Sequence, residues 1–309
     1  MLTRQSPPLM YRTFVILRHT FLESIVQPIY SLLIGLGAAI IIIFAMLPFF
    51  TLGEDTIMYK AVALDIVLLL VLIATLFATS KSIYEEIEDR TMLTLMSKPV
   101  AKWEVLLGKY LGIIAAAAMA IAILGAIIAI SLAWRIPGDY QLNPNALDER
   151  EIRTIWGFRM LHLAGLWPGL VLMWLQISVL AAVSVAISTR LSLVVNLPAV
   201  IIIYFAGNLT RFIYPLDSGP LAGRGTITKW LASLASIVLP YLENFDLRQK
   251  TIYSRVALAG TAFETGAVKV SELWSYTGIA ALYAICYVTF ALAVGMLLFQ
   301  TRELGGGEG

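Results

Sequence analysis

Long apolar segments alternate with shorter polar ones along this chain of 309 residues. A helix needs about 20 apolar residues to cross the roughly 30 Å of hydrocarbon in a bilayer. Six segments meet or nearly meet that length, and they cover residues 29–52, 61–79, 110–134, 160–188, 191–207 and 277–299. The pattern therefore predicts an all-α integral membrane protein with six transmembrane helices in a single domain, residues 29–309.

The N-terminal residues have a different pattern. Between residues 10 and 27, apolar side chains recur at helical spacing, and they are Phe14, Leu17, Phe21 and Ile25. Polar side chains fall elsewhere on the same helix, which is typical of a helix that lies in the membrane interface. Pro28 interrupts the pattern before the first span. We expect residues 1–28 to form an interfacial helix on the cytosolic side; a frayed tail is the alternative.

Composition agrees with a membrane protein and excludes several other classes. Hydrophobic residues make up 59% of the chain and charged residues only 14%, whereas a soluble domain has nearer 25% charge. The net charge of +2 gives no basis for a nucleic-acid partner. Cys286 is the one cysteine, so the chain has neither an internal disulfide nor a cysteine cluster for a metal.

The distribution of Lys and Arg predicts the orientation. Basic residues gather in 1–28 and 80–109, whereas the short segment 53–60 contains only Lys60. Cytosolic loops are enriched in Lys and Arg, so we expect both termini in the cytosol. Residues 135–159 and 208–276 are then outer loops. Within the second, the apolar stretch 230–241 is too short to span and predicts a re-entrant or interfacial helix.

The charged stretch 81–109 is too polar for the bilayer and has its own pattern. It begins with acidic residues at helical spacing, then has an apolar run over 91–96, and Pro99 stops the helix before a new one starts near Trp103. A cytosolic apolar tip beside carboxylates indicates a contact with another protein. The alternative is that this tip packs under the N-terminal helix.

Residues 83–112 resemble the cytoplasmic loop of the ABC-2 type permeases, the membrane subunits of ATP-binding-cassette transporters. The matching residues are the acidic pair Glu85-Glu86, then Arg90-Thr91, Ser97–Val100 (SKPV), Trp103-Glu104 and Gly108–Gly112 (GKYLG). Residues 186–208 and 239–246 are also similar to that family. The sequence departs from the family at Thr94, where Glu is commoner, which puts one polar contact with the ATPase in doubt.

The resemblance implies a specific architecture. Two permease copies, identical or paralogous, form the translocation path in the lipid bilayer, here a prokaryotic cell membrane. The segment 81–109 is then a coupling helix that docks on a separate ABC ATPase subunit, which binds ATP and Mg. By the same resemblance, polar side chains orient against the ATPase and apolar ones fill its groove: Glu85, Glu86, Glu88 and Arg90, then Met92, Leu93 and Leu95.

Nothing in the sequence indicates catalysis in this chain. It has no G-x-x-x-x-G-K-[ST] or H-E-x-x-H sequence, and its only histidines are His19 and His162. We therefore expect no enzyme activity, cofactor or metal here, and an exporter driven by the partner ATPase. Asp65 is the one clear acid inside a predicted span, which makes it a candidate intramembrane polar site. An ion-coupled secondary transporter and a non-transporting scaffold are the alternatives.

Overall fold

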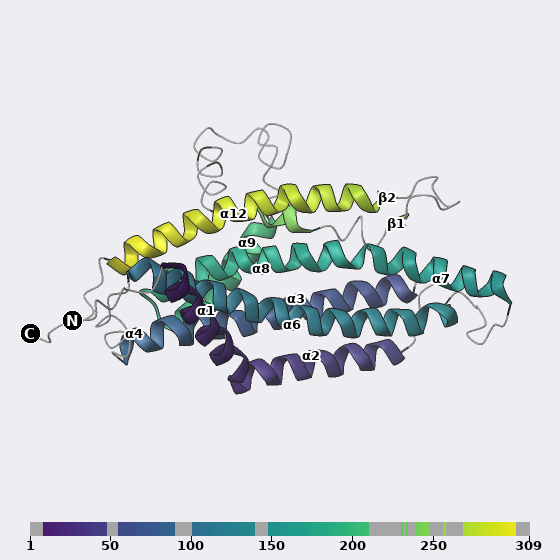
Figure 1. Cartoon of the computed structure of the whole chain (residues 1–309), viewed down its shortest axis with the longest axis horizontal. Coiled ribbons are helices and arrows are strands. Elements are labelled where there is room, and N and C mark those ends of the chain that lie inside the picture. The colour runs from purple at the N-terminus through teal and green to yellow at the C-terminus, as the bar shows by residue number, and fades with distance from the viewer. Residues whose placement is uncertain are drawn as a thin grey trace, which may run out of the picture.

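The computed structural model describes residues 9–47, 55–89, 101–139, 148–209, 230, 233, 239–246, 256–257 and 268–300. Nearly all of these residues are helical, which confirms the predicted all-α class. The exception is a parallel pairing of two residues each between β1 (Val256–Ala257) and β2 (Val268–Lys269). The long helices lie side by side along the longest axis of the molecule (Figure 1).

Eight longer helices make up the bundle. In chain order they are α1 (Leu9–Val26), α2 (Pro28–Met46), α3 (Asp55–Thr79), α6 (Lys102–Asp139), α7 (Glu149–Ala164), α8 (Leu166–Ser188), α9 (Leu193–Leu209) and α12 (Val270–Gln300). Within the described residues, five helical stretches are long and apolar enough to cross a membrane. The fifth predicted span, α9, is apolar but has 17 residues.

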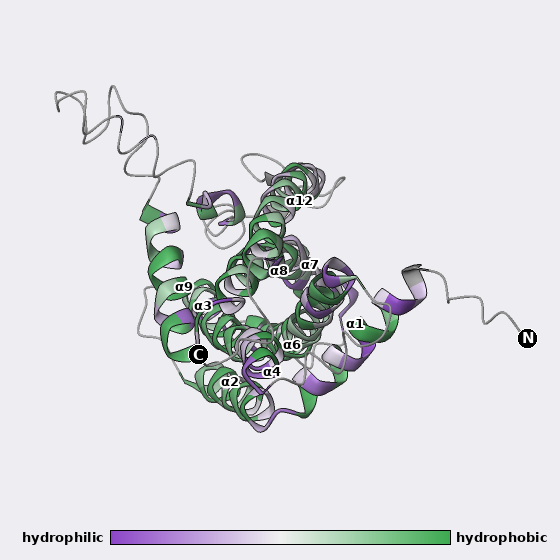
Figure 2. Ribbon diagram, turned by 90° about the vertical axis from the view of Figure 1, so that its left-hand side faces the viewer, coloured by the Kyte–Doolittle hydropathy of each residue, from purple (hydrophilic) through white to green (hydrophobic). Residues whose placement is uncertain are grey.

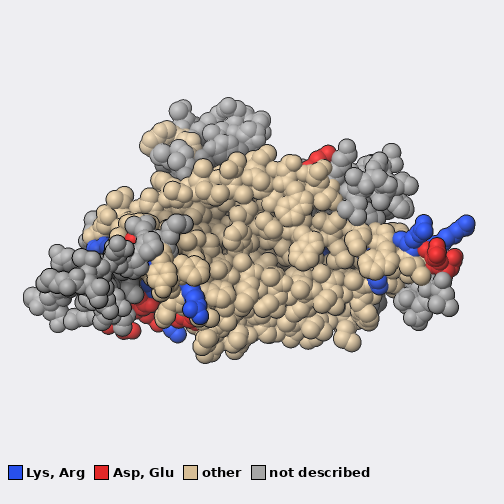
Figure 3. Space-filling model, in the orientation of Figure 1, with Lys and Arg blue, Asp and Glu red and all other residues tan. Residues whose placement is uncertain are grey.

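Several helices extend well beyond the predicted spans. α3 continues through η1 (Ser80–Glu85) and α4 (Glu86–Glu88) as 34 helical residues, and α6 alone has 38. At 1.5 Å per residue α6 is about 57 Å long, nearly twice the hydrocarbon thickness. Figure 3 shows charged side chains gathered at the two ends of a long uncharged band.

Within the described residues, the segment 135–159, which was expected as an outer loop, is helical at both of its ends. Arg135 lies inside α6, and residues 149–159 lie inside α7. The acidic residues of this stretch favour the start of a helix. Asp148 is the N-cap of α7, and Glu149 and Glu151 lie in its first turn, where carboxylates suit the positive end of the helix dipole.

The fourth predicted span is broken near Pro168, which lies in the first turn of a new helix. Proline has no N–H, so Pro168 cannot donate to the carbonyl oxygen of Ala164, four residues earlier. α7 ends at Ala164, Gly165 follows as a turn, and α8 starts at Leu166. α7 therefore ends at the residue whose carbonyl oxygen would have accepted the hydrogen bond that Pro168 cannot donate.

The core of the bundle lies between α3, α6 and α8. Viewed down the bundle, these helices are central, and α1, α2, α9 and α12 lie around them (Figure 2). Fully buried side chains include Val67 of α3, Leu124 and Ile128 of α6, and Ile177 of α8. Small residues allow close packing, as expected between membrane helices: a Cβ on Gly295 of α12 would lie 3.0 Å from Cα of Ala186 in α8.

The N-terminal helix α1 crosses α6 at two glycines spaced as G-x-x-x-G. A Cβ on Gly108 would lie 2.9 Å from Cβ of Ile16, and one on Gly112 would lie 2.7 Å from the carbonyl oxygen of Leu17. Thr20 on this face is buried, whereas Phe14 on the other side is 60% exposed. The predicted helix within residues 1–28 is confirmed as a helix, in which Phe21 and Ile25 pack against the core and Tyr11 and Phe14 are exposed.

Only part of the predicted outer segment 208–276 lies within the described residues. Residues 242–245 form the short helix η3 (Leu242–Phe245), whose Leu242 and Phe245 are buried. A Cβ on Gly207 of α9 would lie 2.7 Å from the carbonyl oxygen of Pro240, so this segment packs closely on α9. Most of the apolar stretch 230–241 lies outside the described residues.

Candidate functional site

The charged stretch singled out by the sequence begins as a continuation of α3. After Thr79 the hydrogen bonding becomes π-helical over η1 (Ser80–Glu85), and α4 then ends near Asp89. Such π-helical turns are rare and frequently lie at functional sites. The second helix of the stretch, α6, begins at Lys102, close to the predicted restart at Trp103.

A buried carboxylate fixes the start of α6. The backbone N–H of Ala101 donates to Oε2 of Glu104 over 3.2 Å, and Glu104 is almost wholly buried. This is half of a capping box, in which a side chain in the first turn satisfies an N–H that has no partner within the helix. The carboxylate also suits the positive end of the helix dipole. The start of α6 is thus held in place by its own sequence.

One buried lysine joins the two arms of the stretch. Lys109 of α6 is 3% exposed, and its Nζ lies 2.6 Å from Oε1 of Glu86 in α4. The same Nζ donates to the carbonyl oxygen of Ser82 over 2.6 Å and to its Oγ over 3.1 Å. An ammonium has three donors, so these acceptors match its full capacity. We call Lys109, Glu86 and Ser82 the Lys109 joint.

A second buried polar group connects the same π-helix to two other helices. The Nδ2 of Asn196 in α9 lies 2.9 Å from Oγ of Ser80 in η1, 2.8 Å from Oγ of Ser184 and 3.0 Å from Oγ of Ser188 in α8. Thr79 also bonds to Ser184, and all five residues are buried. We call Asn196, Ser80, Ser184, Ser188 and Thr79 the Asn196 cluster.

The Lys109 joint and the Asn196 cluster meet in η1. Ser82 ties this π-helix to α6, and Ser80 ties it to α8 and α9. Buried polar groups are held strongly in their pairings because separating them leaves unpaired polar atoms away from water. An ion pair and buried hydrogen bonds therefore connect α4 and η1 to α6, α8 and α9.

The structure places the predicted contact residues in two groups. Glu85 and Glu88 are exposed, as a contact with a partner requires. Glu86 is paired with Lys109, and its side chain is 26% exposed, so its carboxylate serves the internal joint. The remaining predicted contacts lie outside the described residues, namely Arg90, Met92, Leu93 and Leu95.

Asp65, the candidate polar site within a span, lies on an exposed side of α3. Met58 and Leu69 share that side and are 45% and 57% exposed. Lys60, five residues earlier in α3, is buried, and its Nζ donates to the carbonyl oxygen of His162 near the end of α7 over 3.2 Å.

A third polar group holds the opposite end of the bundle. Arg135 of α6 is 8% exposed, and its Nη1 donates to the carbonyl oxygens of Ala45 and Leu47 at the end of α2, over 3.0 and 2.9 Å. Its guanidinium also pairs with Asp55 of α3 and with Asp139 of α6. We call Arg135 and these partners the Arg135 knot, which fastens α2, α3 and α6 to one another.

The sequence pattern does not indicate the residues that make these connections. Lys109 is typical of the boundary of a span, Arg135 falls in the segment expected as an outer loop, and Asn196 and Ser184 are polar residues common between membrane helices. One signal was readable, because the spacing of Gly108 and Gly112 is typical of a close helix crossing. Ser82, a partner of Lys109, and Ser80, a partner of Asn196, lie 27 and 116 residues away, so no local pattern indicates these pairings.

In the part of the chain that the structure describes, neither end of the bundle contains a group of side chains that could hold a metal ion. No three His, Cys, Asp or Glu side chains gather there as ligands. The site consists of hydrogen bonds and ion pairs between helices.

Comparison with known proteins gives one clear result. A family model described as "ABC-2 family transporter protein" matches residues 46–304. A search of curated proteins finds no match. The matched range begins at the end of α2 and includes all of the Lys109 joint and the Asn196 cluster.

Proposed function

The chain belongs to the ABC-2 transporter family, and on this premise we propose that it is the permease subunit of an ATP-driven exporter, coupled through residues 81–109. A separate ATPase subunit binds ATP and Mg and supplies the energy, and this chain contributes no catalytic residue. The observation that carries the proposal is the Lys109 joint. The joint connects α4 and η1, in the proposed coupling segment, to the membrane helix α6 by an ion pair and hydrogen bonds.

The proposed arrangement in the membrane has six crossings, with α9 as the shortest. Its 17 residues span about 26 Å, within the range that a thin or locally adapted bilayer accepts. α4 and the last turn of α12 lie at the same end of the bundle (Figure 1), which supports a cytosolic position for both. In this arrangement α1 lies in the cytosolic interface, with exposed Phe14 toward lipid.

The proposed docking surface combines exposed carboxylates with an apolar tip. Glu85, Glu88 and Asp89 are exposed at the end of the α3 extension. Carboxylates at the rim of an interface steer and orient a basic partner. The apolar contribution of Met92, Leu93 and Leu95 is a prediction from the sequence. Together they describe an ATPase groove that is apolar inside and basic at its edge.

Movement of the ATPase would reach the membrane by two routes. The Lys109 joint carries it to α6, and the Asn196 cluster carries it to α8 and α9. α8 and α9 are joined by a turn of four residues, from Thr189 to Ser192, so they move as a pair. The route needs no contact between the ATPase and these two helices.

A second permease copy is part of the proposal, because two copies form the translocation path in the ABC-2 permeases that the chain resembles. Asp65, Met58 and Leu69 share an exposed side of α3. We place this side toward the translocation path.

The test distinguishes assembly of the permease with the ATPase subunit from the transmission of movement between the two. The permease is co-expressed with the ATPase subunit, and both co-purification and ATP turnover in proteoliposomes are measured. Leu93→Asp and Glu88→Lys are expected to reduce co-purification at least tenfold, because they place a charge in the apolar contact or reverse the rim charge. Glu149→Lys is the matched control, since Glu149 is 86% exposed at the opposite end of the bundle.

Variants of the joint should behave differently. Glu86→Gln is expected to leave co-purification unchanged and to lower the transport achieved per ATP hydrolysed, because the ATPase still docks while the joint is loosened. Normal assembly and normal turnover in Leu93→Asp and Glu88→Lys would refute the coupling role. Transport that continues without ATP and stops when the proton gradient collapses would instead establish ion-coupled transport.

A further inference from the structure

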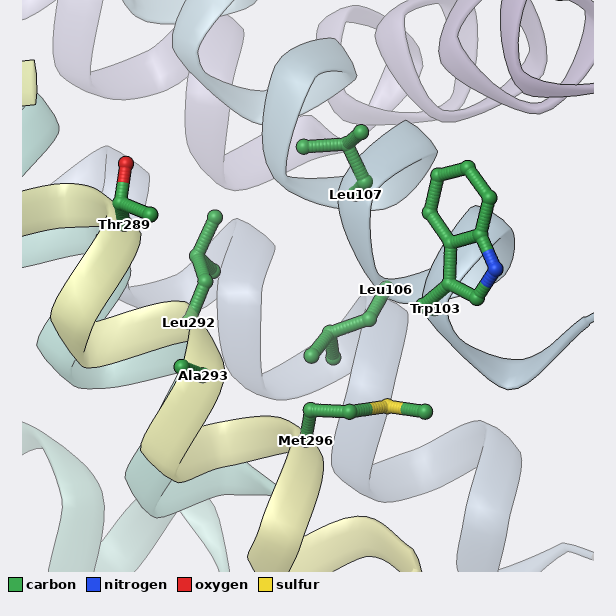
Figure 4. A pocket seen from close by; sticks show the side chains of 7 residues that line it. All are labelled: Trp103, Leu106, Leu107, Thr289, Leu292, Ala293 and Met296. Carbon is green, nitrogen blue, oxygen red and sulfur yellow. The ribbon is translucent and has the colours of Figure 1, made fainter.

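An apolar groove opens between the first turns of α6 and the last third of α12. Its lining is shown in Figure 4: Trp103, Leu106 and Leu107 of α6 face Thr289, Leu292, Ala293 and Met296 of α12. Its volume of about 310 Å³ lies at the lower end of the range for small-molecule sites. The only side-chain hydroxyl in this lining, that of Thr289, donates to the carbonyl oxygen of Ile285 over 2.7 Å.

The groove exists because small side chains lie where α12 faces α6. Thr289 and Ala293 are four residues apart, so they share one side of α12 and leave a hollow between the larger Leu292 and Met296. Leu106, on the α6 side, is 5% exposed and belongs to the same buried cluster as Phe299. The hollow therefore has a rigid apolar floor.

A cation lies at the end of the groove nearest the coupling segment. Lys102 Nζ lies 5.4 Å from the centroid of the Phe299 ring, one turn beyond the lining residue Met296. At the same end of α12, Arg190 Nε donates to the carbonyl oxygen of Leu298 over 3.1 Å. Trp103 is 41% exposed, and tryptophan typically lies at the level of the lipid headgroups. The groove thus runs from headgroup level into the hydrocarbon.

We propose that this groove binds an anionic phospholipid, with one acyl chain between α6 and α12 and the headgroup phosphate beside Lys102. The lining of this hollow is almost wholly apolar and offers water few hydrogen-bond partners, so water is a poor occupant. In a membrane the available apolar filler is an acyl chain. The charge of Lys102 then selects the headgroup, since each basic residue near the surface attracts anionic lipid.

A second copy of the chain is a poorer occupant. In a two-fold dimer of membrane proteins, the same residues of both copies meet at the same depth. A dimer centred on this groove would bring Lys102 and Arg190 of one copy toward Lys102 and Arg190 of the other, and like charges in an interface are unfavourable. The lipid proposal stands on the groove and its cation and does not depend on transport or on the ATPase.

Native mass spectrometry of the full chain in a nonionic detergent tests the proposal. Dioleoyl phosphatidylglycerol is expected to be retained on the wild-type chain with a Kd about fivefold lower than that of dioleoyl phosphatidylcholine, from the effect of one basic residue at the surface. Lys102→Glu should remove this preference. Ala293→Trp, which fills the groove from an exposed position, should reduce retention of both lipids.

Leu297→Trp is the matched control, because Leu297 is 63% exposed on α12 and does not line the groove. Thr289→Leu is a milder filling variant if Ala293→Trp does not fold. Equal retention of phosphatidylglycerol by the wild type and the filling variants would overturn the proposal. So would equal affinity for the two lipids, and so would a dimer that dissociates when Ala293 is replaced, because a second copy would then occupy the groove.

Discussion

Arg159 of α7 donates a hydrogen bond from Nε to the carbonyl oxygen of Ala133 in α6 over 3.0 Å. This carbonyl is the one that Pro137 leaves without its helical partner, because proline has no N–H to donate to the residue four positions earlier. The guanidinium of Arg159 also lies 5.7 Å from the centroid of the Trp156 ring. The Arg159 side chain of α7 thus supplies the hydrogen bond that the Ala133 carbonyl of α6 lacks, and it connects the two helices.

The contribution of the Arg159 hydrogen bond to the free energy of unfolding should depend on Pro137. Arg159→Met is expected to lower the free energy of unfolding by about 1–3 kcal/mol, the usual cost of leaving a partly buried acceptor unpaired. In a Pro137→Ala background the backbone N–H is restored, so the same substitution should cost much less. A double-mutant cycle on unfolding in detergent measures the difference. Equal costs in both backgrounds would show that Arg159 acts only through Trp156.

Lys109 is expected to be among the least replaceable residues in α6. Lys109→Ala leaves the Glu86 carboxylate without its cation, and breaking a buried ion pair costs about 3–5 kcal/mol, here toward the lower end because Glu86 is partly exposed. Ser82→Ala should cost about 1 kcal/mol, because the stronger bond to the Ser82 carbonyl remains. Thermal unfolding of the purified chain measures both. A larger loss in Ser82→Ala would contradict the assignment.

Gly112 should tolerate no side chain. Even a methyl group in Gly112→Ala would lie 2.7 Å from the carbonyl oxygen of Leu17 and 2.8 Å from Cβ of Thr20, so α1 must move away from α6, at a cost of about 1–3 kcal/mol. Hydrogen exchange of the α1 amides should accelerate.

The matched control for Gly112 is Gly278→Ala in α12, where nothing lies within 4 Å of the added Cβ. Exchange in α1 should be unchanged in that variant. Unchanged exchange in Gly112→Ala as well would mean that α1 does not depend on this crossing.

Two arginines at the end of the bundle opposite α4 should differ sharply in their effect on stability. Arg135→Leu removes a buried guanidinium that pairs with Asp55 and Asp139, and its loss is expected to cost about 3–5 kcal/mol. Arg153→Leu removes a surface pair with Glu149, in which both side chains are more than four-fifths exposed, and should cost less than about 0.5 kcal/mol. Unfolding midpoints in matched detergent compare the two. Similar midpoints would refute the role of the Arg135 knot.

The sequence predicted the helices well and their ends poorly. Apolar runs identify α2, α3, α6, α8 and α12 because burial in lipid requires length and hydrophobicity together. Hydropathy decides only which residues suit hydrocarbon, so a helix that continues into water looks like a span followed by a loop. That is why Arg135, inside α6, was assigned to an outer loop.

The candidate site was located from the sequence, but its internal connections were not. The acidic start and the restart near Trp103 were correctly read as helix, since their composition and Pro99 are local signals. The pairing of Lys109 with Glu86 joins two helices and depends on how they fold against each other. A charged residue at the edge of a span is also typical of a membrane boundary, so nothing in the sequence pattern favours an internal pairing of Lys109.

The stretch from Asp55 to Glu88 contains neither glycine nor proline. It begins beside the guanidinium of Arg135 and ends beside the ammonium of Lys109. Helices bend sharply at proline, at glycine or at π-turns, and here only the π-turn at Ser80–Glu85 is present, next to the Lys109 end. Residues 55–79 therefore behave as a stiff rod, about 37 Å long, so a tilt imposed at the end near Lys109 also moves the end near Arg135.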